Sequence, residues 1–244
     1  MYTLIKIDEI NNLGAVRIRI RSLLASMNKR QKEKDSDLNG DYRIHKKIYT
    51  KEMNKDYTIL IPQMAPIHFE LIEAAAKASG YHVELLRECT SKTVETGLKY
   101  VNNDACYPSI LTTGQMIEAL QSGKYDLNKT AIIMSQTGGG CRATNYIGFI
   151  RKALKDAGFA NVPVISFNVV GMEKMPGFKL TLPFLERLFK SVILGDLIQK
   201  LLSKNRAYEK NKGETQKLFD LWLDKCKKLV TKSTLKEFKN SIYE

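Results

Sequence analysis

Between residues 57 and 168 the sequence alternates short apolar runs with helix-like segments, and this alternation limits the fold more than any other feature. The apolar runs cover residues 57–62, 81–86, 130–135 and 162–168. Two of the intervening segments end at a glycine, Gly80 and Gly158, shortly before the next apolar run. Buried strands that alternate with helices are typical of parallel sheets. The sequence therefore predicts a Rossmann-like α/β fold built from parallel βα units.

Helical extensions are expected on both sides of this α/β region. The predicted helices inside it cover residues 68–79, 92–101, 109–121 and 145–157. After an irregular stretch, apolar residues recur at helical spacing over 182–202, 218–229 and 235–242. At the other end, a strand over 3–7, a helix from about Leu13 and a charged linker over 28–42 are expected. The predicted organisation is a basic segment and linker (1–56), a cysteine-bearing α/β domain (57–168) and a mainly helical region (169–244).

Composition favours a cytoplasmic protein that does not enter a membrane. The chain has 244 residues, 43% of them hydrophobic, yet no apolar run approaches the length of about 18 residues that a membrane span needs. The N-terminal residues carry charges that are unlike a signal peptide. There are four cysteines, Cys89, Cys106, Cys141 and Cys226. In a reducing compartment, cysteines more often bind metal or perform redox chemistry than form disulfides.

Positive charge is concentrated at the two ends of the chain. The formal net charge is +13, and residues 1–57 and 200–244 contribute +5 and +6 of it. Such ends can attract an acidic partner, a phosphate-bearing ligand or nucleic acid, or they can simply be a solvated lysine-rich surface. Aromatic residues do not interleave with the basic ones as they do in single-strand binding proteins, so nucleic acid is the weakest of these partners.

The segment 102–146 carries the candidate chemistry. Cys106 lies in a turn, NNDACYP, and Cys141 follows a triple glycine, Gly138, Gly139 and Gly140, in the sequence TGGGCR. A strand that leads through a glycine loop into a helix is how α/β domains place reactive groups at the carboxyl edge of a sheet. This edge is therefore the predicted functional site.

Spacing alone leaves the role of the cysteines open. Zinc sites usually show pairs of ligands two to four residues apart, and no such pair occurs here. A nucleophilic cysteine needs a base, and although His68 and His82 are available, nothing in the spacing selects either. Iron–sulfur clusters accept thiolates from separate loops, and backbone N–H groups of a glycine run can stabilise their negative charge. Ordinary buried cysteine is the remaining interpretation.

Long stretches of the sequence resemble the 2-hydroxyacyl-CoA dehydratase superfamily. The two main ones are residues 97–108 (GLKYVNNDACYP) and 136–146 (QTGGGCRATNY). Shorter ones are PQMAPIHF from Pro62, PVISFN from Pro163 and residues 171–178. The likeness covers most of residues 57–210. Within the superfamily, the sequence is most similar to the dehydratase-like region at the end of the large CoA-substrate-specific enzyme activase-related proteins.

The resemblance implies an iron–sulfur protein of anaerobic metabolism. In this superfamily an ATP-dependent activator delivers a low-potential electron to a cysteine-bound cluster of the 4Fe-4S or double-cubane type. Cys106 and Cys141 match the family's cysteine motifs and are the implied ligands. Cys89 is added as a third ligand because it follows the predicted strand 81–86 at the same edge. Gly138, Gly139 and Gly140 would let the backbone approach the cluster, and Arg142 would balance its charge.

The chain also departs from the family. It has no phosphate-binding loop of the kind that an ATPase domain carries, which suggests a separate subunit, a shortened form or part of a larger protein. No residue identifies a site for coenzyme A. Electron transfer is therefore better supported than the alternative, a catalytic subunit acting on an acyl-CoA. A further alternative is a binding module without a cluster, in which the glycine loop holds an anion. Homo- and hetero-oligomers are both compatible with the sequence.

Overall fold

The structure is a computed structural model, which describes residues 13–34, 46–102, 105–136, 138, 142–168, 173 and 175–243. Contacts divide the chain into two units, residues 1–43 and 44–244. The first unit contains helix α1 (Leu13–Lys34), and the second contains every other helix and strand that is described. None of the helices in the described part of the chain is long and apolar enough to cross a membrane.

Helix α1 begins where the sequence predicts but continues beyond the expected end. Residues 28–34 were expected to belong to a charged linker, and instead they form the last two turns of α1. Arg30, Gln31 and Glu33 are good helix formers, so a charged sequence does not by itself end a helix. The expected strand at 3–7 and the remainder of the linker lie outside the described residues.

The second unit is built around a sheet of four parallel strands, which confirms the predicted α/β fold. The strands are β1 (Thr58–Pro62), β2 (Val83–Leu86), β3 (Thr130–Ser135) and β4 (Val164–Phe167). Their order in the sheet is β2-β1-β3-β4, and all three pairings are parallel. Strand β1 aligns Ile59 with Val83 on one side and with Ala131 on the other. Each strand falls inside one of the four apolar runs of the sequence.

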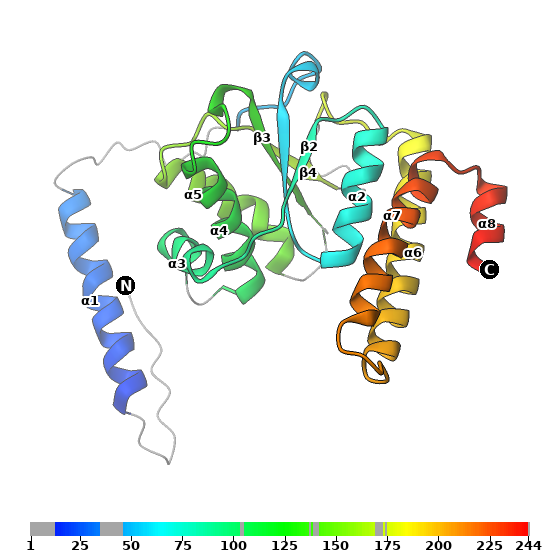
Figure 1. The fold of residues 1–244 in the computed structure, drawn as a ribbon. Helices are drawn as coiled ribbons and strands as arrows, with labels where there is room; N and C mark the ends of the chain where they lie inside the picture. Colours follow the sequence, from blue (N-terminus) through cyan, green and yellow to red (C-terminus); the bar gives the residue numbers. More distant parts are fainter. Residues whose placement is uncertain are drawn as a thin grey trace. The chain divides into compact units, whose positions relative to one another are not determined.

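Helices cover both faces of the sheet (Figure 1). On one side lies α2 (Pro66–Ala78), with α6 (Leu182–Arg206) and α7 (Glu214–Lys232) packed on it, and on the other lie α4 (Tyr107–Gln121) and α5 (Tyr146–Asp156), with α3 (Ser91–Tyr100) packed on α4. Helix α8 (Leu235–Tyr243) follows α7. Short 3-10 turns occur at Met53–Lys55, Leu127–Lys129 and Arg142–Asn145.

Alternating side chains of the central strands divide the core into two parts. Ile59 and Ile61 of β1 point towards α2, α6 and α7, whereas Leu60 points towards α4 and α5. All three side chains are almost fully buried. A strand buried on both faces reads as a continuous apolar run, which is why the sequence identified these strands without a period-two pattern.

The order of the strands creates a switch point between β1 and β3. The chain leaves β1 for α2 on one face of the sheet and leaves β3 for α5 on the other face. The loops after these two adjacent strands therefore separate, and in open α/β sheets ligands bind in the crevice that this separation leaves. The loop after β1 contains Gln63 and Met64, and the loop after β3 contains the triple glycine.

Helices α3 and α4 form an antiparallel pair with very close backbones. A Cβ atom on Gly114 would lie 2.1 Å from the carbonyl oxygen of Thr93, and one on Gly97 would lie 2.1 Å from that of Ile110. Only glycine permits this approach at either position. Thr93 also donates a hydrogen bond from Oγ1 to Glu118 at 2.7 Å, farther along α4. The pair fixes the position of α4, whose first turn follows Cys106.

We expect Gly114→Ala to destabilise the protein by about 1–3 kcal/mol because the new methyl group displaces the α3 backbone. The control is Gly148→Ala in α5, where a Cβ atom would meet nothing within 4 Å. There alanine should stabilise the helix by up to about 1 kcal/mol. Urea unfolding of both variants measures the difference, and two effects of the same sign would contradict the close packing of α3 on α4.

Candidate functional site at the carboxyl edge

A buried glutamine on α4 connects the ends of β1 and β2. Gln115 accepts a hydrogen bond at Oε1 from the backbone N–H of Gln63, at 3.1 Å. Its Nε2 donates to the carbonyl oxygens of Leu86 and Glu88, at 3.3 and 3.0 Å. Gln115 therefore fixes the segments that follow both strands. Sequence reasoning missed it, although a glutamine within the otherwise apolar face of a predicted helix was a usable signal.

The end of β3 is held in a similar way. Gln136 donates from its backbone N–H to Phe167 and from Nε2 to the carbonyl oxygen of Thr144, at 2.9 and 3.3 Å. Its Oε1 accepts a hydrogen bond from Ser166 at 2.7 Å. Gln136 precedes the glycine loop and Thr144 follows it, so this side chain joins the two ends of the loop and ties them to β4.

Within the glycine loop, Gly138 is exposed and has a φ angle of 72°. This left-handed conformation favours glycine because a side chain would strain it. Gly139, Gly140 and Cys141 lie outside the described residues. Arg142 begins the 3-10 turn at Arg142–Asn145, and its side chain is likewise not described.

Cys106 contacts the start of α5, the helix that follows the glycine loop in the sequence. It is the N-cap residue of α4, and its Sγ lies 2.8 Å from the hydroxyl of Tyr146, the first residue of α5. Tyr146 is buried, with 6% of its surface exposed. Cys106 and Tyr146 are 40 residues apart in sequence. The fold thus brings the turn that holds Cys106 against the helix that follows Cys141 by five residues.

The surroundings of Cys106 favour its thiolate form. The hydrogen bond with Tyr146 is the main cause that lowers the pKa of the Cys106 thiol, and hydrogen bonds from Ser109 add to it. Cys106 also precedes the first turn of α4, where the N–H groups of the helix carry partial positive charge. A thiolate is the form that binds metals and attacks electrophiles. Cys106 therefore has the chemical character of a metal ligand or of a nucleophile.

Cys89 has different surroundings. It is exposed and directly precedes Thr90, the N-cap residue of α3. Its neighbour Glu88 contacts Gln115, which lies nine residues along α4 from Cys106, or about 13 Å at the usual helical rise. Cys89 thus stands beside the middle of α4, whereas Cys106 stands at its beginning.

Cys226 and the two histidines considered as bases, His68 and His82, have other surroundings. Cys226 is buried on α7, and burial raises the pKa of its thiol to about 11. His68 on α2 lies against Gly195 of α6, and its Nε2 is 3.0 Å from Asp196. His82 precedes β2 at the opposite, amino edge of the sheet, where its carbonyl accepts from Ile59.

A cysteine-bound cluster needs several thiolates, and the described residues supply only part of such a set. Among them no group of three or more His, Cys, Asp or Glu side chains is close enough to hold a metal ion. Cys141, which the sequence assigns as a ligand, is not among these residues. The lowered pKa of Cys106 fits the thiolate chemistry of a cluster ligand, so the donor that is described is suitable for the group.

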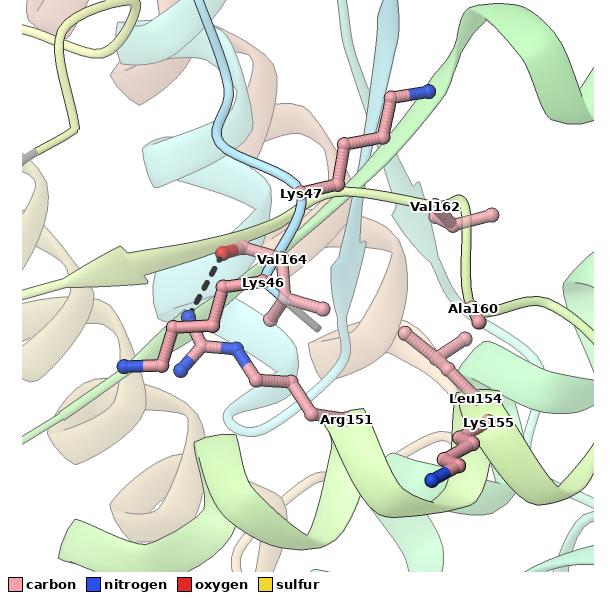
Figure 2. Close-up of a pocket in the computed structure, with 8 residues that line it drawn as sticks. All are labelled: Lys46, Lys47, Arg151, Leu154, Lys155, Ala160, Val162 and Val164. Carbon is pink, nitrogen blue, oxygen red and sulfur yellow. Dashed lines mark hydrogen bonds between the residues drawn. The ribbon is translucent and has the colours of Figure 1, made fainter. Parts of the chain in front are cut away.

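A small basic pocket of about 70 Å³ lies elsewhere, beside β4 (Figure 2). Arg151 donates to the carbonyl oxygen of Val164 at 3.4 Å and to both oxygens of Glu173, at 2.8 and 2.6 Å. Lys46 also contacts Glu173, at 2.9 Å. These ion pairs hold the pKa of Glu173 down at about 2. These contacts attach Glu173 and Lys46 to the edge strand β4. The guanidinium of Arg151 is already paired with Glu173.

Comparison of the chain with protein-family models, with curated proteins and with solved structures finds no match.

We expect Tyr146→Phe to raise the pKa of the Cys106 thiol because the hydroxyl that stabilises the thiolate is lost. Alkylation of cluster-free protein by iodoacetamide, followed at the Cys106 peptide by mass spectrometry from pH 6 to 10, measures this shift. At neutral pH the reaction should become several-fold slower. Tyr107→Phe is the control, since Tyr107 is exposed beside Cys106 and its hydroxyl has no hydrogen bond within the described structure. An unchanged profile for Tyr146→Phe would refute the assigned contact.

We expect Glu173→Gln to destabilise the protein at pH 7 by about 2–3 kcal/mol, because Arg151 is only 9% exposed and loses its charged partner. Since folding depresses the pKa of Glu173, its contribution is complete above about pH 4.5 and is lost as the pH falls towards 2. The difference in unfolding free energy between wild type and variant, measured by urea unfolding, should therefore shrink as the pH falls from about 4.5 towards 2. Asp156→Asn, which removes an exposed pair with Lys152, should cost less than about 1 kcal/mol.

Proposed function

We propose that this chain is an iron–sulfur electron-transfer or reductase-like component related to the 2-hydroxyacyl-CoA dehydratases. The observation that carries the proposal is the contact of 2.8 Å between Cys106 and Tyr146. It joins the two sequence stretches that resemble the family, because Cys106 belongs to the first and Tyr146 closes the second. Separate loops that converge on one point at a switch-point edge are what a shared cluster requires.

Each residue of the site has a distinct role in this proposal. Cys106 and Cys141 bind the cluster as thiolates, and Cys89 is the third ligand if the loop before α3 reaches it. Backbone N–H groups of Gly138, Gly139 and Gly140 hydrogen-bond to the cluster, and Arg142 offsets its negative charge. The cluster, of the 4Fe-4S or double-cubane type, would accept one low-potential electron at a time. Tyr146 orients the Cys106 sulfur through their contact of 2.8 Å.

The proposed electron donor is an ATP-dependent activator. The resemblance to the superfamily implies that this partner would supply the energy for a low-potential transfer. A reducing cytoplasm without oxygen is the proposed location, because exposed cluster thiolates oxidise readily. Whether the electron then passes to an acyl-CoA substrate is decided by dehydration and double-bond reduction assays with the activator present.

The test is anaerobic expression followed by iron and sulfide analysis and an ultraviolet–visible spectrum. Wild type should be brown, and Cys106→Ala should lose most of its iron and sulfide. Cys226→Ala is the matched control, because Cys226 is buried away from this edge and should leave the cluster intact. Colourless, iron-free wild-type protein from a strictly anaerobic preparation would refute the proposal. Cys89→Ala decides the third ligand: loss of iron assigns Cys89 to the cluster, and retention removes it.

A further inference from the structure

An apolar cavity of about 330 Å³ lies between the sheet and helices α2 and α6. Fourteen of the described residues line it, and thirteen of these are apolar: Ile61, Pro62, Met64, Phe69, Ile72, Ala76, Val83, Ile133, Met134, Phe167, Phe178, Phe184 and Leu188. The one polar residue among the fourteen is Ser135. None of the fourteen is charged, so the described lining differs in character from that of the basic pocket beside β4.

The cavity opens at the functional edge of the sheet. Pro62, Ser135 and Phe167, the last residues of β1, β3 and β4, all line it. Met64 in the loop after β1 also lines it and is 40% exposed, so it lies where the cavity meets solvent. The cavity therefore begins at the switch point and extends along the face of the sheet that α2 and α6 cover.

Aromatic side chains in the wall of the cavity pack against one another. The ring of Phe178 packs edge-on against Phe167 and Phe184, with centroids 6.2 and 6.1 Å away. Phe69, Ile72 and Leu188 are only partly buried although they line a core region. Protein interiors are normally packed with few voids larger than a water molecule. An apolar pocket of this size that is open to solvent is thus a place where a ligand can bind.

We propose that this cavity binds a small, neutral, mainly aromatic molecule with at most one hydroxyl group. Aromatic walls favour an aromatic ligand, and an engineered apolar cavity of about 150 Å³ already binds benzene. A charged ligand would lose its hydration without gaining a partner from the described lining, which contains no cation. Among the lining residues that the structure describes, Ser135 is the one whose side chain can hydrogen-bond to a ligand hydroxyl.

This inference does not depend on an iron–sulfur cluster, and its test uses cluster-free protein. Binding of toluene, 4-methylphenol and 4-methylbenzoate is measured by ligand-observed NMR and calorimetry. Wild type should bind toluene and 4-methylphenol and bind 4-methylbenzoate at least tenfold more weakly. Ser135→Ala should weaken the binding of 4-methylphenol several-fold and leave the affinity for toluene unchanged.

Leu188→Trp tests the position of the site, because the larger ring fills the cavity from α6 and should abolish binding. Val192→Trp is the control on the next turn of α6, where the side chain is exposed and outside the lining. Circular dichroism and thermal melting check that both variants fold. If Leu188→Trp does not fold, Ile72→Phe replaces it as a narrowing variant from α2. Absence of binding to wild type, equal binding by wild type and the folded filling variant, or preference for 4-methylbenzoate would overturn the proposal.

Discussion

The parallel pairing of β1 with β3 is the constraint on which the rest of the second unit depends. The chain continues from β1 to β2 on one side and from β3 to β4 on the other, so right-handed crossovers place α2 and α5 on opposite faces of the sheet. That separation leaves a crevice at the carboxyl edge between the ends of β1 and β3, and the sheet itself divides the core in two. The edge is then closed by side chains from elsewhere, chiefly Gln115 and Gln136, which replace the regular pairing that ends with the strands.

The proposed cluster and the proposed apolar ligand lie on different sides of this edge. On the α4 and α5 side, the thiol of Cys106 is polarised by Tyr146 and by the start of a helix. On the α2 and α6 side, the sheet ends above an apolar cavity in which Ser135 is the one polar residue of the described lining. A redox group and a neutral organic molecule would thus approach the same switch point from opposite faces. The last residues of β1 and β3 separate them.

Some features were predictable because they follow from local sequence. The four strands were expected within a few residues of where they lie, since strands buried on both faces are continuous apolar runs. The start of α1 was also correct, but its end was not, because arginine, glutamine and glutamate support a helix as readily as a linker. The cysteine motifs were identified from sequence, whereas Gln115 and Tyr146 were missed as parts of the site because their partners lie 27 to 52 residues away.

The sequence by itself determined the alternation of strands and helices and the parallel α/β class, and it predicted turns at Cys106 and at the triple glycine. These properties depend on hydrophobic pattern and on glycine and proline, which act over a few residues. Only the tertiary structure decided that Cys106 contacts Tyr146, that Cys89 stands beside the middle of α4, and that an apolar cavity opens beneath the switch point. Such relations depend on the order of the strands and on the close crossing of α3 and α4, which no local pattern encodes.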